Sequence, residues 1–189
     1  MDLQFIYREF GMAAFTLAPT TPEDLLHHLG VAQGAPVSNI LSDLHDEEAG
    51  FLAARAVSPH WSIAIETNGE TGWIRCTPHL MQALSQRCGT VYSTCFTDEG
   101  ARLLIARDDG ILFGLDIHTG NRWGHSKDEA IDEQLAQVGF HPGGLRAMDP
   151  RLKDMRTIDR TDVAFAAVSG HTLNSCLGST GWIGGVAQR

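Results

Sequence analysis

The chain of 189 residues has no long apolar run and very little lysine. No stretch approaches the roughly 18 consecutive apolar residues that a membrane-spanning helix requires, so we expect no membrane association. Asp2, Arg8 and Glu9 interrupt the apolar residues at the start of the chain, which lacks a positively charged leader. The sequence therefore predicts no signal peptide and a cytoplasmic protein. Lys127 and Lys153 are the only lysines, a bias of composition from which no function follows.

The chain also lacks the short motifs of common catalytic sites. It has no Gly-x-Ser-x-Gly nucleophile elbow and no His-Glu-x-x-His zinc motif. Phosphate-binding loops place glycines between a strand and a helix. No helix pattern follows the glycine-rich tail at 178–185. We therefore predict no catalytic residue and no cofactor.

The four cysteines and nine histidines do not follow a metal-binding pattern. Cys76, His79, Cys88 and Cys95 are residue types that bind zinc. However, Cys88 falls on the apolar face of a predicted helix, and Cys95 falls within a predicted strand. Buried free cysteine behaves as a small apolar residue. We expect reduced thiols in the core and no metal site.

Acidic residues outnumber basic ones, at 23 Asp and Glu against 14 Lys and Arg, and the formal net charge is −9. A protein that binds nucleic acid by displacing counterions needs the opposite balance, so we expect no nucleic-acid binding. The acidity favours solubility and permits a protein partner with a basic surface.

Hydrophobic periodicity and turn residues predict an α+β fold. Three strands with turns between them are expected over 91–117, and a hairpin is expected over 61–75 around Asn68-Gly69. One or two strands are expected over 3–16. Together these predict an antiparallel meander sheet of about five to six strands, packed against three to five helices.

The expected helices have recognisable starts. Thr21 and Thr77 each precede a proline and can cap a helix. A further helix is expected over 42–57. A capping-box sequence begins at Ser126, and the helix that it starts is expected to end at Gly139.

The composition suggests a division near residue 140. We expect residues 1–140 to form the α+β core domain. Residues 141–189 are expected to form a linker at 141–160, a short helix at 162–168 and a glycine-rich tail that packs on the core.

Two acids and two tryptophans are candidates for partner contact. Glu66 shares a strand face with Ser62 and Ala64, and we expect that face to be open to solvent or to a basic partner. Exposed tryptophans often contribute much of the binding energy at interfaces. The candidate partner-binding residues are Glu66, Glu70, Trp73 and Trp182.

Two short motifs in the chain resemble those of a known family. The first is Trp-x-x-Ala-Ile-Glu-x-Asn-Gly, and the second, after a helix and three strands, is Arg-Trp-Gly. The matching positions are Trp61, Ala64, Ile65, Glu66, Asn68, Gly69, Arg122, Trp123 and Gly124. Over about 14–140 the chain resembles an uncharacterised family of bacterial single-domain proteins, a domain of unknown function.

The resemblance implies a small intracellular α+β domain of a type often found beside toxin or secretion genes. It carries over no catalytic residue. It also suggests a structural pair, in which Arg122 bonds a carboxylate or strand carbonyls while Trp123 fills the core.

Several functions are open at this point. The favoured one is a non-enzymatic binding protein, immunity-like or antitoxin-like, that sequesters a protein partner. The alternative is a small-molecule-binding protein or enzyme with a pocket between sheet and helices. Its possible lining residues are Asp116, His118, Arg122 and His125. A homodimer that pairs through a sheet edge, such as the N-terminal strand, is a third possibility.

Overall fold

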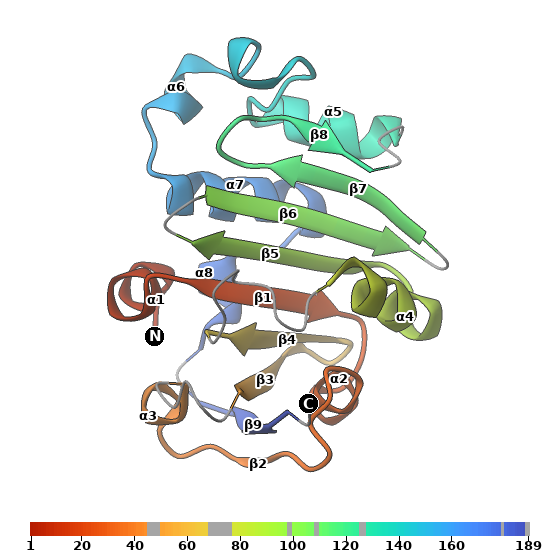
Figure 1. The fold of residues 1–189 in the computed structure, drawn as a ribbon, viewed down its shortest axis with the longest axis vertical. Coiled ribbons are helices and arrows are strands. Elements are labelled where there is room, and N and C mark those ends of the chain that lie inside the picture. Colours follow the sequence, from red (N-terminus) through yellow and green to blue (C-terminus); the bar gives the residue numbers. More distant parts are fainter. Residues whose placement is uncertain are drawn as a thin grey trace.

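A computed structural model describes residues 1–44, 50–67, 77–97, 100–107, 110–124, 128–178 and 180–187. Over these ranges the protein is α+β, with one nine-stranded antiparallel sheet and helices on both of its faces (Figure 1). The strands are β1 Ala13–Ala18, β2 Ala35–Pro36, β3 Phe51–Ser58, β4 Trp61–Glu66, β5 Val91–Thr97, β6 Gly100–Arg107, β7 Gly110–Asp116, β8 Arg122–Trp123 and β9 Ile183–Val186. Their order in the sheet is β2-β9-β3-β4-β1-β5-β6-β7-β8.

The helices are α1 Leu3–Phe10, α2 Pro22–His28, α3 Ile40–Leu44, α4 Pro78–Cys88, α5 Glu129–Gln137, η1 Gly144–Arg146 (a 3₁₀ helix), α6 Pro150–Lys153, α7 Thr157–Ser169 and α8 Leu173–Cys176. The expected α+β class is confirmed, as is the meander of β5, β6 and β7. The expected five to six strands are too few. Among the described residues, no helix combines the length and the apolar content needed to cross a bilayer.

The first element is a helix, where the sequence suggested a strand. The Oδ1 atom of Asp2 accepts a hydrogen bond from the backbone N–H of Phe5, which caps the start of α1. Gly11 ends the helix with a φ of 69°. Leu3 and Ile6, three residues apart, are the buried positions. This is a helical period, and the aromatic residues Phe5, Tyr7 and Phe10, which are not fully buried, obscured it.

Strand β3 occupies much of the range where a helix was expected, 42–57. It lies between β4 and β9 in the sheet. Ala53 and Ala54 point to opposite faces and are both fully buried. A strand that is covered on both faces loses the alternation of apolar and polar residues that identifies strands in a sequence.

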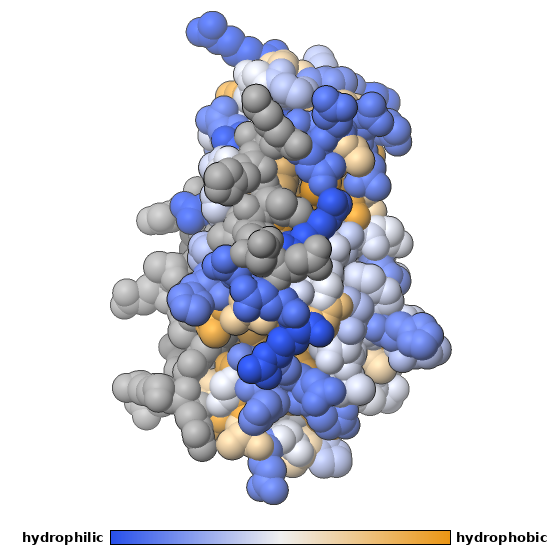
Figure 2. All heavy atoms as spheres, turned by 90° about the vertical axis from the view of Figure 1, so that its right-hand side faces the viewer, coloured by the Kyte–Doolittle hydropathy of each residue, from blue (hydrophilic) through white to orange (hydrophobic). Residues whose placement is uncertain are grey.

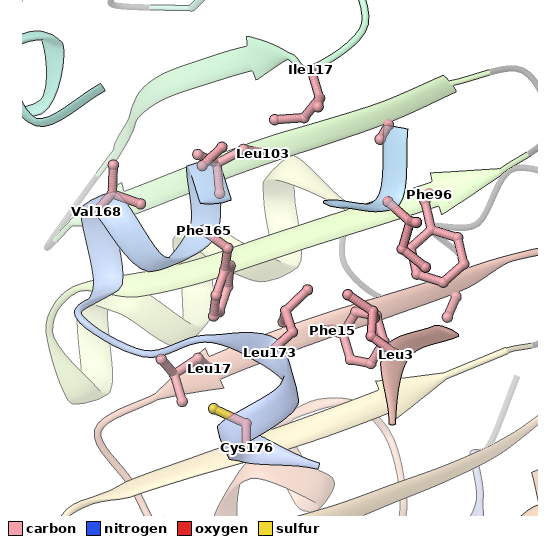
Figure 3. Packing of buried hydrophobic residues seen from close by; sticks show 14 of the residues in the cluster. Leu3, Phe15, Leu17, Phe96, Leu103, Ile117, Phe165, Val168, Leu173 and Cys176 are labelled. Atoms are coloured by element: carbon pink, nitrogen blue, oxygen red, sulfur yellow. The ribbon is translucent and has the colours of Figure 1, made fainter. Parts of the chain in front are cut away.

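One face of the sheet is covered by α7 and α8, which lie behind it in Figure 1. Figure 3 shows Phe165 of α7 and Leu173 of α8 packing over Phe15 and Leu17 of β1. All four side chains are fully buried, as is Leu103 of β6 in the same cluster. This is the larger of two hydrophobic clusters in the described part of the chain.

The opposite face is covered by α2 and α4. Leu25 and Leu26 of α2 and Met81 and Leu84 of α4 form the second cluster with small sheet residues such as Ala64. On the side of the molecule that carries these helices, hydrophilic residues surround small hydrophobic areas (Figure 2).

Residues 141–160 form η1, α6 and the start of α7, whereas the sequence suggested a linker. Met148 and Leu152 from this range are buried in the same cluster as the central strands. Helix α7 is longer than the helix expected over 162–168. Helix α5 is capped by Asp128; the cap expected at Ser126 lies outside the described residues.

Both edges of the sheet are very short strands. β2 and β8 have two residues each, and Pro36 in β2 has no N–H to offer a further strand. β1 lies in the centre, between β4 and β5. The suggestion that the N-terminal strand pairs across a dimer axis is therefore wrong, because that strand has no free edge.

Candidate binding cavity at Trp182

A cavity of about 470 Å³ opens where the start of α1, the segment between β2 and α3, and the start of β9 meet. It lies on the flank of the molecule where N marks the start of the chain in Figure 1. Its lining residues are Met1, Asp2, Phe5, Val37, Ser38, Asn39, Ile40 and Trp182. Small-molecule binding sites commonly have volumes of roughly 300–1,000 Å³.

The first wall is fixed by hydrogen bonds from α1 to helices near the end of the chain. The backbone N–H of Leu3 donates to Oδ1 of Asn174 on α8 at 2.9 Å. Nε2 of Gln4 donates to Oδ1 of Asp159 on α7 at 2.7 Å. With the Asp2 cap, these bonds hold the first turn of α1, and with it Phe5, against the rest of the cavity.

The second wall is fixed through the sheet. The backbone N–H of Val37 donates to the carbonyl oxygen of Trp182 at 3.0 Å. This bond extends the pairing of β2 with β9, in which Pro36 lies opposite Ile183. The residues that follow, Ser38 and Asn39, are exposed at the mouth of the cavity.

Trp182 forms part of the cavity wall, with only 3% of its surface exposed. Its Nε1–H donates to the carbonyl oxygen of Gly178 at 2.9 Å. The guanidinium carbon of Arg55 lies 5.8 Å from the centre of its ring, a cation–π contact. A Cβ at Gly178 would overlap the Arg55 guanidinium, so a larger residue here would displace that side chain from its place beside Trp182. Trp182 is therefore buried in the wall and not exposed, and its predicted role in partner contact stays a prediction.

Glu66 is also buried, with 3% of its surface exposed, although an open face was expected. It lies on β4 opposite Ala14 of β1 and Leu52 of β3. This is the face that α2 and α4 cover, and Ser62 and Ala64 on it are buried too. The residues of this face are small because helices pack closely against them. They do not indicate that it is solvated.

Asp116, His118 and Arg122 lie in one turn but do not line the Trp182 cavity. Oδ1 of Asp116 accepts a hydrogen bond from the backbone N–H of Thr119 at 2.7 Å. His118 is exposed. Arg122 turns toward α5, where its Nε donates to Asp132. Asp116 and Arg122 thus hold the local structure together.

Three other candidate residues lie outside the described residues. They are Glu70, Trp73 and His125. The Asn68-Gly69 turn is outside them as well. Their predicted roles stay predictions.

Arg160 on α7 was not singled out from the sequence, yet it is only 6% exposed. Its Nη1 donates to the carbonyl oxygen of His118 at 3.4 Å, and its Nη2 to Oγ1 of Thr157 at 3.3 Å. Burial lowers the pKa of Arg160, while the charge of Asp116 opposes this shift. Arg160 therefore ties α7 to the turn that begins at Asp116. An arginine among alternating charged residues gives no signal of burial in the sequence.

The described cysteines, Cys88, Cys95 and Cys176, are free thiols. Burial raises the pKa of Cys176 to about 11 and also raises the pKa of Cys88. Such thiols are protonated at neutral pH and react slowly. In the part of the chain that the structure describes, no group of three or more His, Cys, Asp or Glu side chains is placed to hold a metal ion.

Comparison of the chain with protein-family models, curated proteins and solved structures gave no match. The resemblance of its two short motifs to a bacterial family stays a prediction.

Proposed function

We propose that this chain is a non-enzymatic, intracellular binding protein that sequesters a protein partner, in the manner of immunity proteins and antitoxins. The Trp182 cavity is its contact site. The observation that carries the proposal is the cavity itself, of about 470 Å³, with walls from three separated segments that hydrogen bonds hold in place. A site that is formed before the partner arrives loses less conformational entropy on binding.

The lining supports binding. Phe5, Val37, Ile40 and Trp182 supply apolar surface, while Ser38 and Asn39 are polar and exposed at the rim. An apolar centre with a polar rim is the usual arrangement of protein interfaces, and tryptophan is prominent among the residues that dominate their affinity.

Two of the residues expected to line a pocket between sheet and helices have structural roles, which supports the same proposal. Asp116 accepts a backbone hydrogen bond within its own turn, and Arg122 binds α5. The raised pKa of the Cys176 thiol makes it a poor nucleophile at neutral pH.

A variant that fills the cavity tests the proposal. Ser38→Trp places a large side chain at the mouth, where residue 38 is exposed and its replacement disturbs no buried contact. Gln86→Trp makes a similar change at an exposed position of α4, on the other face of the sheet. Each tagged protein is used to capture partners from a native lysate at moderate salt.

We expect one protein to be retained in stoichiometric amount by the natural chain and by Gln86→Trp, and to be lost with Ser38→Trp. Retention by all three baits would place the contact elsewhere. Recovery of no stoichiometric protein by any bait would contradict the proposed function.

Small-molecule binding is the second candidate, favoured by the volume of the cavity alone. It predicts a compound that raises the melting temperature of the natural chain and of Gln86→Trp but not of Ser38→Trp. A screen of metabolites by thermal shift makes this comparison directly.

A further inference from the structure

We infer that Asp162 on α7, acting through Asn174, positions the first turn of α1 in the wall of the Trp182 cavity, and that a proton on the Asp162 carboxyl releases this turn from α8. This goes beyond the proposed function, since it concerns how the cavity wall is held and not what fills the cavity. Asp162 is a positioning residue in this scheme, because it touches neither the cavity nor α1 directly.

The Asp162 carboxylate, which is half-buried, binds the start of α8. One of its oxygens, Oδ1, accepts a hydrogen bond from the backbone N–H of Leu173, the first residue of α8, at 2.5 Å. The other, Oδ2, accepts from Nδ2 of Asn174 at 3.5 Å. An ionised carboxylate can only accept hydrogen bonds, so it requires the nitrogen of the Asn174 amide to face it.

The Asn174 side chain carries this contact on to α1. Because Nδ2 faces Asp162, Oδ1 of the same amide is free to accept the backbone N–H of Leu3, which it does at 2.9 Å. Leu3 is the first residue of α1, and its side chain is buried in the same cluster as that of Leu173 (Figure 3). Phe5, two residues further on, lines the cavity. The orientation of one amide thus decides whether the first turn of α1 is bonded to α8.

A proton on Asp162 favours the opposite orientation of this amide. A carboxylic acid has an O–H group to donate, and the acceptor that Asn174 offers is Oδ1, once its amide has turned over. Nδ2 then faces the backbone N–H of Leu3, and two donors form no bond. α1 keeps the bond from Gln4 to Asp159 but loses the bond from Leu3.

The groups around Asp162 favour its protonation. Burial and the negative charge of Asp159 raise the pKa of Asp162 above 3.8, against the hydrogen bonds from α8. Asp159 lies one turn earlier on α7 and is itself paired with Arg156 at 2.8 Å. On α8, the Cys176 thiol has a pKa raised to about 11 by burial, so it stays uncharged when Asp162 titrates.

NMR can follow the two contacts of the relay separately. The backbone N–H signal of Leu173 reports the state of Asp162 directly, and that of Leu3 reports the bond to Asn174. Asp2 adjoins Leu3 and would titrate in the same range, so the starting protein is the full chain with Asp2→Asn, which keeps the helix cap. Both signals and their protection from hydrogen exchange are measured from about pH 3 to about pH 7.

Three further changes in this protein separate the roles of the residues. Asn174→Ala removes the relay at an exposed position and leaves the bond from Leu173 to Asp162 in place. Asp162→Asn imitates the protonated carboxyl at every pH, since it accepts from Leu173 and donates to Asn174. Asp159→Asn is the matched control, because it removes a neighbouring charge and still accepts the bond from Gln4.

We expect the Leu3 and Leu173 signals of the starting protein to titrate with one midpoint. Below it, the protection of the Leu3 N–H from exchange should be about two- to tenfold lower. In Asp159→Asn both signals should titrate together at lower pH, because a negative charge near the carboxyl is gone. In Asp162→Asn neither should titrate, and Leu3 should have low protection throughout. In Asn174→Ala the Leu173 signal should titrate alone.

Titration of Leu3 together with Leu173 in Asn174→Ala would overturn the inference, because the coupling would then bypass the amide. A Leu3 signal that does not follow the Leu173 midpoint in the starting protein would overturn it too, as would a Leu3 signal that titrates in Asp162→Asn. None of these results bears on the proposed function, which requires only that the cavity binds a partner.

Discussion

The guanidinium of Arg122 on β8 donates a hydrogen bond to the carbonyl oxygen of Phe140, 18 residues further along the chain, at 2.7 Å. The same side chain donates to Asp132 on α5 and to the carbonyl oxygen of Gly120. Its central carbon lies 5.7 Å from the centre of the Phe113 ring. One arginine therefore joins β8, α5 and the segment that follows α5. The predicted bonds from Arg122 to a carboxylate and to carbonyl oxygens are confirmed, whereas Trp123, which was expected to fill the core, is only partly buried at its edge.

Replacement of Arg122 by alanine is expected to lower the free energy of unfolding by about 2–4 kcal/mol, because it leaves a partly buried carboxylate and two carbonyl oxygens without their donor. Arg122→Lys keeps the charge but cannot reach all three acceptors, so we expect an intermediate loss. Urea denaturation measures both variants. Arg151→Ala is the control, since the Arg151 side chain is 89% exposed beside Asp149. A loss in Arg122→Ala no larger than that in Arg151→Ala would contradict this role.

Gly114 on β7 lies directly beneath the indole of Trp123 on β8, and a Cβ at this position would overlap the ring. We expect Gly114→Ala to displace Trp123 and to cost about 1–3 kcal/mol of stability. The displaced indole becomes more hydrated, so its fluorescence emission should move to longer wavelength. Gly34→Ala is the comparison, because its new Cβ would meet the movable end of Leu26 at 3.1 Å and Ile183 at an ordinary contact distance of 3.5 Å. It should change stability by less than about 0.5 kcal/mol.

The stability of the protein should depend on the ionisation of Asp162. Burial raises the pKa of this carboxyl above its ordinary 3.8, against the hydrogen bond that it accepts from the backbone N–H of Leu173. The folded state therefore holds this proton more tightly than the unfolded state does. The contribution of the protonated Asp162 carboxyl to stability is complete below pH 3.8 and is lost as pH rises through its pKa in the folded state.

We expect the stability of the natural chain relative to Asp162→Asn to fall as pH rises from below 3.8 toward 7, because asparagine still accepts the hydrogen bond but does not titrate. Urea unfolding of both proteins across this range measures it. The stability of the natural chain relative to Asp149→Asn should change with pH in the opposite direction and fall as pH is lowered. Hydrogen bonds from Arg151 lower the pKa of Asp149 to about 2, so its contribution is present above pH 3.8 and is lost as pH falls through about 2. Parallel slopes for the two variants would contradict these assignments.

The thiols of Cys95 and Cys176 should resist alkylation in the native protein. Both are buried, and burial raises the pKa of Cys176 to about 11. Iodoacetamide at pH 7.5, followed by mass spectrometry, should label neither residue within minutes, while the protein unfolded in urea should be labelled at both. Fast labelling of native Cys176 would indicate an activated thiol and would favour an enzyme.

Local patterns in the sequence were sufficient to predict those helices and strands whose caps, turns and periodicity lie within the element itself. The proline-opened helices α2 and α4 and the β5–β6–β7 meander have their own caps, turns and periodicity. The Gly-rich tail forms β9 for a reason that is not local. Gly184 lies so close to Phe51, and Gly185 to Val31, that a side chain at either position would collide with the neighbouring chain. A strand made by such close approach has no signature of its own.

The candidate site was harder to predict for a similar reason. Only Trp182 of its lining residues was singled out from the sequence, as a residue for partner contact and not as the wall of a cavity. Phe5 and Val37 enter the cavity because α1 and the segment after β2 meet across the fold, far from each other in the chain. Acids and histidines attract attention as functional residues, whereas an apolar cavity consists of side chains that look like ordinary core.

The position of β9 has a consequence for how this protein matures. Residues 183–186 lie between β2 and β3, both of which are synthesised more than 120 residues earlier. Until residues 182–186 have left the ribosome, the β3 edge that pairs with β9 has no partner strand and the indole that walls the cavity is missing. The candidate site therefore cannot form before this segment has been synthesised, long after β2 and β3.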